Sequence, residues 1–147
     1  MENPFSRKNV NYFHSYNNFY KDYDINGPSL ILIKTTTNMI FGGFTPLNWN
    51  INEEEIVDYD NQTFLFSLYS MKKFDLCENS IAIICKPNMG PIFGNSELYL
   101  SSDLKQGEAF NSEDSSFDSF NCFEFLGKIG NRVKFNVQEI EIIRVLY

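Results

Sequence analysis

The sequence predicts a mainly β fold, an antiparallel sandwich or barrel, in a single domain over residues 1–147. From residue 29 onward, short apolar segments alternate with turn residues, which is the pattern of an antiparallel all-β fold. Hydrophobic residues make up 43% of the chain and charged residues only 21%, so a packed core is expected without disulfides. Because 16% of the residues are aromatic, that core should be rich in phenylalanine.

The first 28 residues lack strand alternation and predict a short helix between Val10 and Asp22. The helix is expected to end before Asn26-Gly27-Pro28, because glycine accepts a left-handed turn and proline cannot continue a helix. Aromatic residues recur in this region at steps of three and four, the period of one helical face: Phe13, Tyr16, Phe19, Tyr20 and Tyr23.

Short apolar segments predict the strands. Residues 29–35 are apolar at both parities, as expected for a strand that is covered on both faces. Residues 36–38 are expected to form the hairpin turn that follows. Near the end of the chain the apolar positions change from odd to even, which predicts a bulge near Gln138-Glu139. The predicted strands are 29–35, 39–44, 63–69, 80–85, 97–101, 120–126, 132–137 and 140–146, and the acidic segments 52–60 and 105–119 are expected to be loops.

Charge and composition argue against several classes of partner. Twelve basic and nineteen acidic residues give a net charge of -7, whereas nucleic-acid binding requires a clustered positive surface. No apolar run approaches the roughly 20 residues that span a bilayer, and the N-terminus lacks the pattern of a secretory signal. We therefore expect a cytoplasmic protein with no membrane insertion and no nucleic-acid partner.

Few residues are of the types that carry catalysis or bind metals. Cys77, Cys85 and Cys122 are an odd number without C-x-x-C spacing, and are predicted to be reduced, buried thiols. His14 is the only histidine, which argues against a multi-histidine metal site and favours a structural role. No serine lies in a G-x-S-x-G elbow, and no cofactor or metal is expected.

Asp22-Tyr23-Asp24-Ile25-Asn26-Gly27 matches the first half of a calcium loop, but the twelfth position, which should be glutamate, is Ile33. The pattern favours a polar turn, with a calcium-responsive domain as an alternative.

Glycines and aromatic residues at strand positions predict structural roles. Gly42 and Gly43 are expected to let backbone or the Trp49 ring pack closely against their strand. Residues 90–94 and 127–130 lack phosphate-loop endings and are interpreted as turns. Apolar positions at strand spacing or beside turns predict a core that contains Trp49, Phe64, Phe66, Phe93 and Phe135.

Glu139 and Glu141 are two residues apart on one predicted strand, so their side chains share a face. The pair is a candidate for binding basic groups of a partner protein, mainly by speeding association. The alternatives are a solvated strand face or an acid and base pair.

Several blocks, in order along the chain, resemble the TLDc domain of the oxidation-resistance family, most strongly over residues 19–145. Three features depart from the family pattern: Gly94-Asn95-Ser96 replaces a run of glycines, the acidic, serine-rich segment 107–119 replaces a T-F-G-N stretch, and the N-terminal part of the domain is only partly represented. Within that part, the resemblance implies a first strand at Phe5-Ser6-Arg7. The resembling blocks are Phe19, 27–35, 40–45 with Trp49, 64–68, 90–94, 98–100 with Asp103, and 135–142.

The resemblance implies a two-sheet antiparallel β-sandwich flanked by short helices, with no established catalytic residues. It also implies a link to protection against oxidative stress and a protein partner such as a subunit of the vacuolar-type proton ATPase (V-ATPase). The leading hypothesis is therefore a non-enzymatic protein-interaction domain. Its rivals are an enzyme that uses Glu139, Glu141 or a cysteine thiolate, and a calcium-responsive domain that uses Asp22, Asp24 and Asn26.

Overall fold

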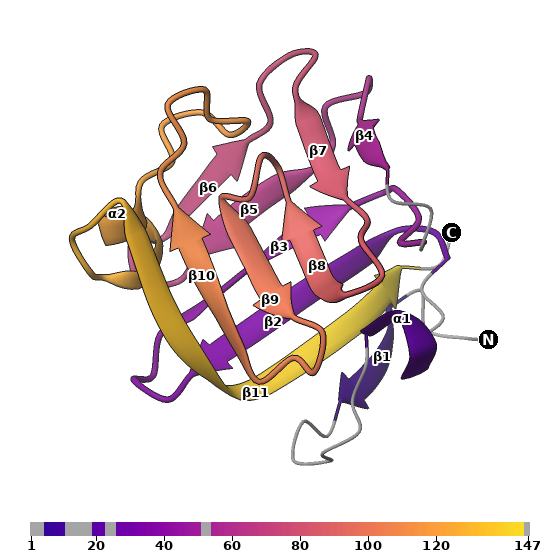
Figure 1. The fold of residues 1–147 in the computed structure, drawn as a ribbon, viewed down its shortest axis with the longest axis horizontal. Coiled ribbons are helices and arrows are strands. Elements are labelled where there is room, and N and C mark those ends of the chain that lie inside the picture. Colours follow the sequence, from indigo (N-terminus) through magenta and orange to yellow (C-terminus); the bar gives the residue numbers. More distant parts are fainter. Residues whose placement is uncertain (1–4, 11–18, 23–25, 51–53, 146–147) are drawn as a thin grey trace.

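The computed structural model describes residues 5–10, 19–22, 26–50 and 54–145, and nearly half of these residues lie in antiparallel strands (Figure 1). Within this described part there are two short helices, α1 (Phe19–Asp22) and α2 (Cys122–Leu126). The strands are β1 (Phe5–Val10), β2 (Ser29–Thr35), β3 (Ile40–Thr45), β4 (Glu55–Val57), β5 (Phe64–Ser67), β6 (Lys72–Asp75), β7 (Ile81–Ile84), β8 (Met89–Phe93), β9 (Leu98–Ser101), β10 (Gln106–Phe110) and β11 (Arg132–Val145).

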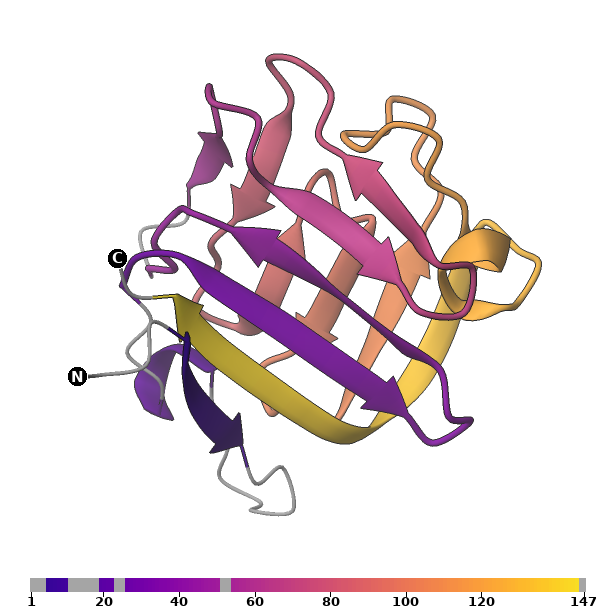
Figure 2. The ribbon, with the colours of Figure 1, turned by 180° about the vertical axis from the view of Figure 1, so that it is seen from behind.

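All the strands belong to one hydrogen-bonded sheet, in the order β4-β7-β8-β9-β10-β11-β2-β3-β5-β6, with β1 also paired to β11. The sheet folds over, so that β7 to β10 lie across from β2, β3 and β5 (Figures 1 and 2). α1 and α2 lie at opposite sides of the molecule (Figure 1). The mainly β, antiparallel class is confirmed, whereas the separation into two sheets is not, because β11 is hydrogen-bonded into both layers.

β11 carries the chain from one layer to the other. Its residues 132–136 pair with β10, and its residues from Val137 to Arg144 pair with β2. The register with β2 shifts between Val137 and Glu139, which confirms the bulge that the change of parity predicts. The bulge lets one strand keep apolar side chains inward on both sides of the bend: Val133, Phe135 and Val137 before it, Ile140 and Ile142 after it.

Aromatic rings fill the space between the layers. Phe41 packs against Phe125 and Phe135, with ring centroids 4.6 Å and 5.0 Å away. Trp49 packs edge-on against Phe93 at 5.3 Å and donates its indole N–H to the Ser29 hydroxyl at 3.1 Å. The prediction of a core rich in phenylalanine is confirmed, and Trp49, Phe93 and Phe135 belong to it.

The prediction of a strand at residues 120–126 is wrong, because residues 122–126 form helix α2. The Asn121 side chain accepts a hydrogen bond from the backbone N–H of Glu124 at 2.9 Å and caps the first turn. Gly127, at φ 81°, ends the helix in the left-handed conformation. These caps and the tertiary packing of Phe125 override the β propensity of a Phe-rich segment.

Four strands of the structure, β4, β6, β8 and β10, are not predicted from the sequence, because each lacks an apolar alternation. β8 covers residues 90–93 of the segment 90–94 that is interpreted above as a turn, and β10 lies in the segment that is interpreted as an acidic loop. A Cβ at Gly90 would lie 2.5 Å from the Ser101 carbonyl oxygen, so the glycine permits close approach of β9. β4 has only three residues and pairs with β7, which is distant in sequence. β6 is largely charged and pairs with β5, the strand before it, in a hairpin.

At the N-terminal end, the expected helix between Val10 and Asp22 is seen only as α1, and residues 11–18 lie outside the described part. The resemblance expected a strand at residues 5–7, which is confirmed and extends to Val10. The hairpin turn at residues 36–38 is also confirmed: Asn38 has a φ of 67°, and its N–H donates to the Thr35 carbonyl at 3.0 Å.

Candidate partner-binding surface

β2, β3, β5 and the second half of β11 lie side by side in one layer (Figure 2). Apolar side chains that are partly exposed line the outward side of this layer. Cross-strand register aligns Ile143, Leu30, Phe44 and Phe64 in one row. These side chains are all partly exposed. We call this surface the outer face, and its apolar members are Leu30, Leu32, Ile40, Phe44, Phe64, Phe66 and Ile143.

Two sequence predictions fail on this face. Phe64 and Phe66 were expected in the core, but they are half-buried on the outer face, and Leu65 between them is fully buried. β2 was expected to be covered on both faces, yet only Ser29, Ile31, Ile33 and Thr35 are buried. Because side chains alternate strictly, the register that places the odd positions of β2 and β5 inward forces the even apolar positions outward.

Phenylalanines pack against one another along the outer face. The rings of Phe44 and Phe64 are stacked at 5.4 Å, and Phe64 lies 6.4 Å from Phe66. The ammonium of Lys73 lies 4.6 Å from the centroid of Phe64. This cation–π contact places a positive charge beside the apolar side chains of the outer face.

Gly42 and Gly43 serve opposite sides of the sheet. A Cβ at Gly42 would lie 1.9 Å from the Ile31 carbonyl oxygen and 3.0 Å from the Phe66 ring, on the outer face. A Cβ at Gly43 would lie 2.7 Å from the ring of Phe93, in the core. The ring packed against Gly43 is thus Phe93, and Trp49 lies behind it.

Glu139 and Glu141 lie at the β11 edge of the outer face. Glu139 is exposed and sits opposite Lys34, and the partly exposed Glu141 sits opposite Leu32. Both follow the bulge and project to the side away from the buried Ile140 and Ile142. The structure therefore places the two glutamates beside the apolar rows.

A more exposed apolar group, which the sequence reasoning missed, continues the outer face at its hairpin end. Leu68 donates its N–H to the Ile40 carbonyl at 2.9 Å, and both residues line a hollow of about 290 Å³ with Met39 and Tyr69. Met71 has a φ of 56° and is 79% exposed. Phe123 of α2 packs edge-on against Tyr69, with ring centroids 6.2 Å apart. The large apolar side chains exposed here are Leu68, Tyr69, Met71 and Phe123.

The cysteines are free, as predicted. Cys85 and Cys122 are buried and Cys77 is half-buried. Burial raises the pKa of all three thiols, and the charges of Asp118 and Glu97 raise the pKa of Cys77 further. A thiolate nucleophile requires the opposite shift.

The metal and histidine predictions are tested only in part. Among the described residues, no group of three or more His, Cys, Asp or Glu side chains could hold a metal ion. His14 and residues 23–25 of the half calcium loop, which include Asp24, lie outside the described residues, so both interpretations stay predictions. In the same described part, no helix is long and apolar enough to cross a membrane.

Gly94 and Glu97 form a buried turn between β8 and β9. Gly94 has a φ of 64°, and a Cβ there would lie 2.6 Å from a Glu97 carboxylate oxygen. That oxygen accepts N–H hydrogen bonds from Asn95 at 3.2 Å and Ser116 at 2.8 Å, which ties the acidic segment to the sheet. The other oxygen is buried without a partner, and desolvation raises the pKa of Glu97.

The raised pKa of Glu97 predicts the direction in which the stability of the domain changes with pH. The folded state holds the proton more tightly than the unfolded chain, so this contribution to stability is present below the ordinary value of 4.5 and is lost as the pH rises through the folded pKa. Glu97→Gln keeps the acceptor oxygen and removes the titration. In urea melts, the free energy of unfolding of this variant relative to wild type should rise between acid and neutral pH.

The matched control for Glu97→Gln is Glu78→Gln, because Glu78 is exposed. Its stability should follow that of the wild type at every pH. Parallel stability curves for Glu97→Gln and the wild type would contradict a buried, titrating Glu97.

Comparison with known proteins agrees with this fold. The family model for the TLDc domain matches residues 10–145, nearly the whole chain. The chain belongs to the TLDc domain family. No curated protein matches it. The match supports a domain of the oxidation-resistance type, and it includes β2, β3 and β11, which build the outer face.

Proposed function

We propose that this TLDc domain is a non-enzymatic protein-binding module that uses the outer face. The observation that carries the proposal is the alternation of buried and partly exposed side chains along β2, β3 and β5. An antiparallel sheet with one solvated face usually has polar residues outward, but here leucine and phenylalanine point outward. Contiguous exposed apolar surface is typical of an interaction site. Neither of the described helices covers this face (Figure 2).

The charges at the edge of the outer face specify the chemistry of the partner. Glu139 and Glu141 flank the apolar rows on β11, and the whole chain is acidic. The partner segment should therefore present an apolar surface with basic residues along one side, so that charge speeds association and apolar contact supplies affinity. We propose a subunit of the V-ATPase as that partner, in the cytoplasm, with protection against oxidative stress as the consequence.

The state of the thiols supports a non-enzymatic role. With raised pKa values, Cys77, Cys85 and Cys122 stay protonated at neutral pH. Peroxide is attacked by thiolates rather than thiols. The domain is therefore proposed to act on oxidative stress through its partner instead of consuming peroxide itself.

Binding of the purified domain to purified V-ATPase, followed by biolayer interferometry, tests the proposal. Phe64→Ser, in the middle of the apolar rows, should lower the affinity roughly tenfold or more. The variant Glu139→Gln with Glu141→Gln should mainly slow association at low salt, with little effect at high salt. Melting curves establish that the variants are folded.

Tyr59→Ser is the matched control, because Tyr59 is 82% exposed and lies in the loop before β5, outside the outer face. It should bind as the wild type does. Absence of binding by the wild type would refute the V-ATPase as partner. Unchanged binding by folded Phe64→Ser would refute the outer face as the surface.

A further inference from the structure

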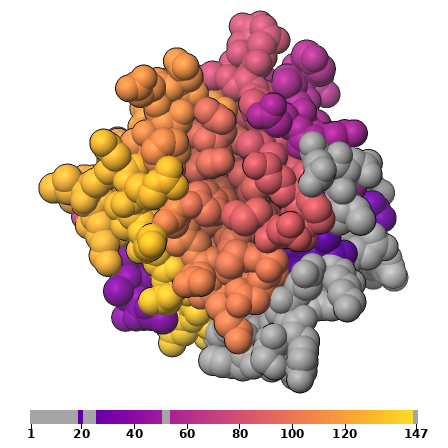
Figure 3. All heavy atoms as spheres, viewed as in Figure 1, coloured from indigo at the N-terminus to yellow at the C-terminus, as the bar shows by residue number. Residues whose placement is uncertain are grey.

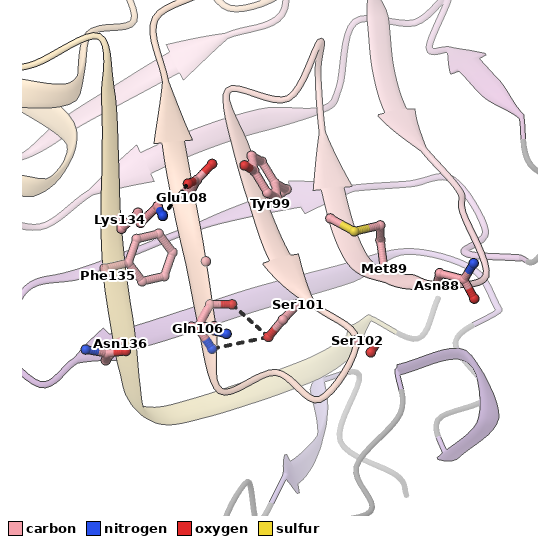
Figure 4. Close-up of a pocket in the computed structure, with 11 residues that line it drawn as sticks. Asn88, Met89, Tyr99, Ser101, Ser102, Gln106, Glu108, Lys134, Phe135 and Asn136 are labelled. Carbon is pink, nitrogen blue, oxygen red and sulfur yellow. Dashed lines mark hydrogen bonds and ion pairs between the residues drawn. The ribbon is translucent and has the colours of Figure 1, made fainter.

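A second concave surface lies on the other layer, over the outward side of β8 to β11. It consists of two adjoining hollows of about 500 Å³ and about 400 Å³, which share Met89 and Tyr99. Figure 3 shows this face of the molecule, and Figure 4 shows the larger hollow with its lining side chains. We call the combined surface the trough.

Register aligns the side chains of the trough in rows across the strands. One row contains Lys134, Glu108, Tyr99 and Ile92, from β11 to β8. Four adjacent strands span roughly 14 Å at 4.7 to 4.9 Å per spacing, the length of about four residues of extended peptide. The trough thus has the dimensions of a short extended segment.

The charge of the trough is opposite to that of the chain. Its lining includes the cations Lys86, Arg132 and Lys134, and a single carboxylate, Glu108. The whole chain has twelve basic and nineteen acidic residues. A local excess of positive charge on an acidic protein points to an acidic ligand.

Arg132 is held in place at the wall of the trough. Its guanidinium pairs with Glu108 at 2.9 Å, donates to the Tyr99 hydroxyl at 3.1 Å and stacks 4.4 Å from the Phe110 ring centroid. Lys134 also approaches Glu108, at 4.0 Å. Because one carboxylate faces two cations and Lys86 stands apart, two positive charges remain for a ligand. A fixed guanidinium loses little entropy when it binds a carboxylate.

We infer that the trough binds a short, extended, acidic segment of a protein. Carboxylates of the segment would pair with Arg132, Lys134 and Lys86, and its apolar parts would contact Tyr99 and Met89. The proposal is independent of the outer face, because the trough lies on the opposite layer and the two surfaces share only β11, whose first half borders the trough and whose second half borders the outer face.

Fluorescence anisotropy with a fluorescein-labelled deca-glutamate peptide tests the inference on the full chain. We expect salt-dependent binding, with amide shifts in NMR spectra confined to β8 to β11. Arg132→Gln with Lys134→Gln should weaken binding roughly tenfold. Glu108→Gln should strengthen binding, since it removes the one carboxylate that lines the trough. A gain in affinity would not result from loss of structure.

The control variant is Lys72→Gln with Lys73→Gln, which removes two positive charges from β6 and should leave the affinity unchanged. Equal affinities for wild type and the Arg132 and Lys134 variant would overturn the inference, as would shifts confined to the outer face. Displacement of the peptide by inorganic phosphate at matched charge would also overturn it, because the trough would then be a general anion site.

Discussion

Phe93→Ala is expected to lower the free energy of unfolding by about 3 to 5 kcal/mol, the cost of deleting a large ring from a packed core. Phe93 is only 1% exposed and packs against Trp49 at 5.3 Å and against the backbone of Gly43. Urea denaturation followed by tryptophan fluorescence measures the loss, and Trp49 reports directly on this contact.

Phe66→Ala is the matched comparison for Phe93→Ala. The two substitutions delete the same ring, but Phe66 is half-buried on the outer face. Its loss should cost about 1 to 2 kcal/mol, in proportion to the apolar area that it removes from water. Equal costs at the two positions would contradict the assignment of Phe66 to an outward position.

Gly43→Val is expected to destabilise the domain by about 1 to 3 kcal/mol or more, by overpacking. The new Cβ would lie 2.7 Å from the Phe93 ring and 2.9 Å from a Leu65 methyl, and both neighbours are buried. Neither side chain can swing into solvent, so the strands must separate or the rings must leave their rotamers. Thermal melts of the purified variant measure the effect.

A double-mutant cycle isolates the contact between Gly43 and Phe93. Gly43→Ala should destabilise the wild type more than it destabilises Phe93→Leu, because the smaller side chain leaves room for the methyl. Equal costs in the two backgrounds would show that the Phe93 ring does not limit this position. If Gly43→Val melts like the wild type but loses its partner, the glycine belongs to a binding surface.

The fold class and several strands could be predicted from the sequence because their information is local. The strand at residues 29–35, the hairpin at 36–38 and the bulge after Val137 follow from apolar parity and turn residues. The helix after Asn121 also had a local signature, a cap followed three residues later by Glu124 and then by Gly127. In the sequence, this cap signature is opposed by the β propensity of the Phe-rich segment, and the tertiary packing of Phe125 decides for the helix.

Parity alone did not determine which side of each strand faces the core. The sequence 63–67 places Phe64 and Phe66 at one parity and Leu65 at the other, and nothing local favours the leucine as the buried residue. The pairing of Gly42 with Phe66 and of Gly43 with Leu65 fixes that choice, since Gly43 must face the Phe93 ring across the core. The candidate surfaces also depend on tertiary structure. Glu139 lies opposite Lys34, and Arg132 contacts Tyr99, only because β11 pairs with strands that are distant in sequence. The sequence by itself determined that this chain is a β-rich, acidic TLDc domain, and the pairing of its strands decided which side chains are left for a partner, because long-range register has no local signature.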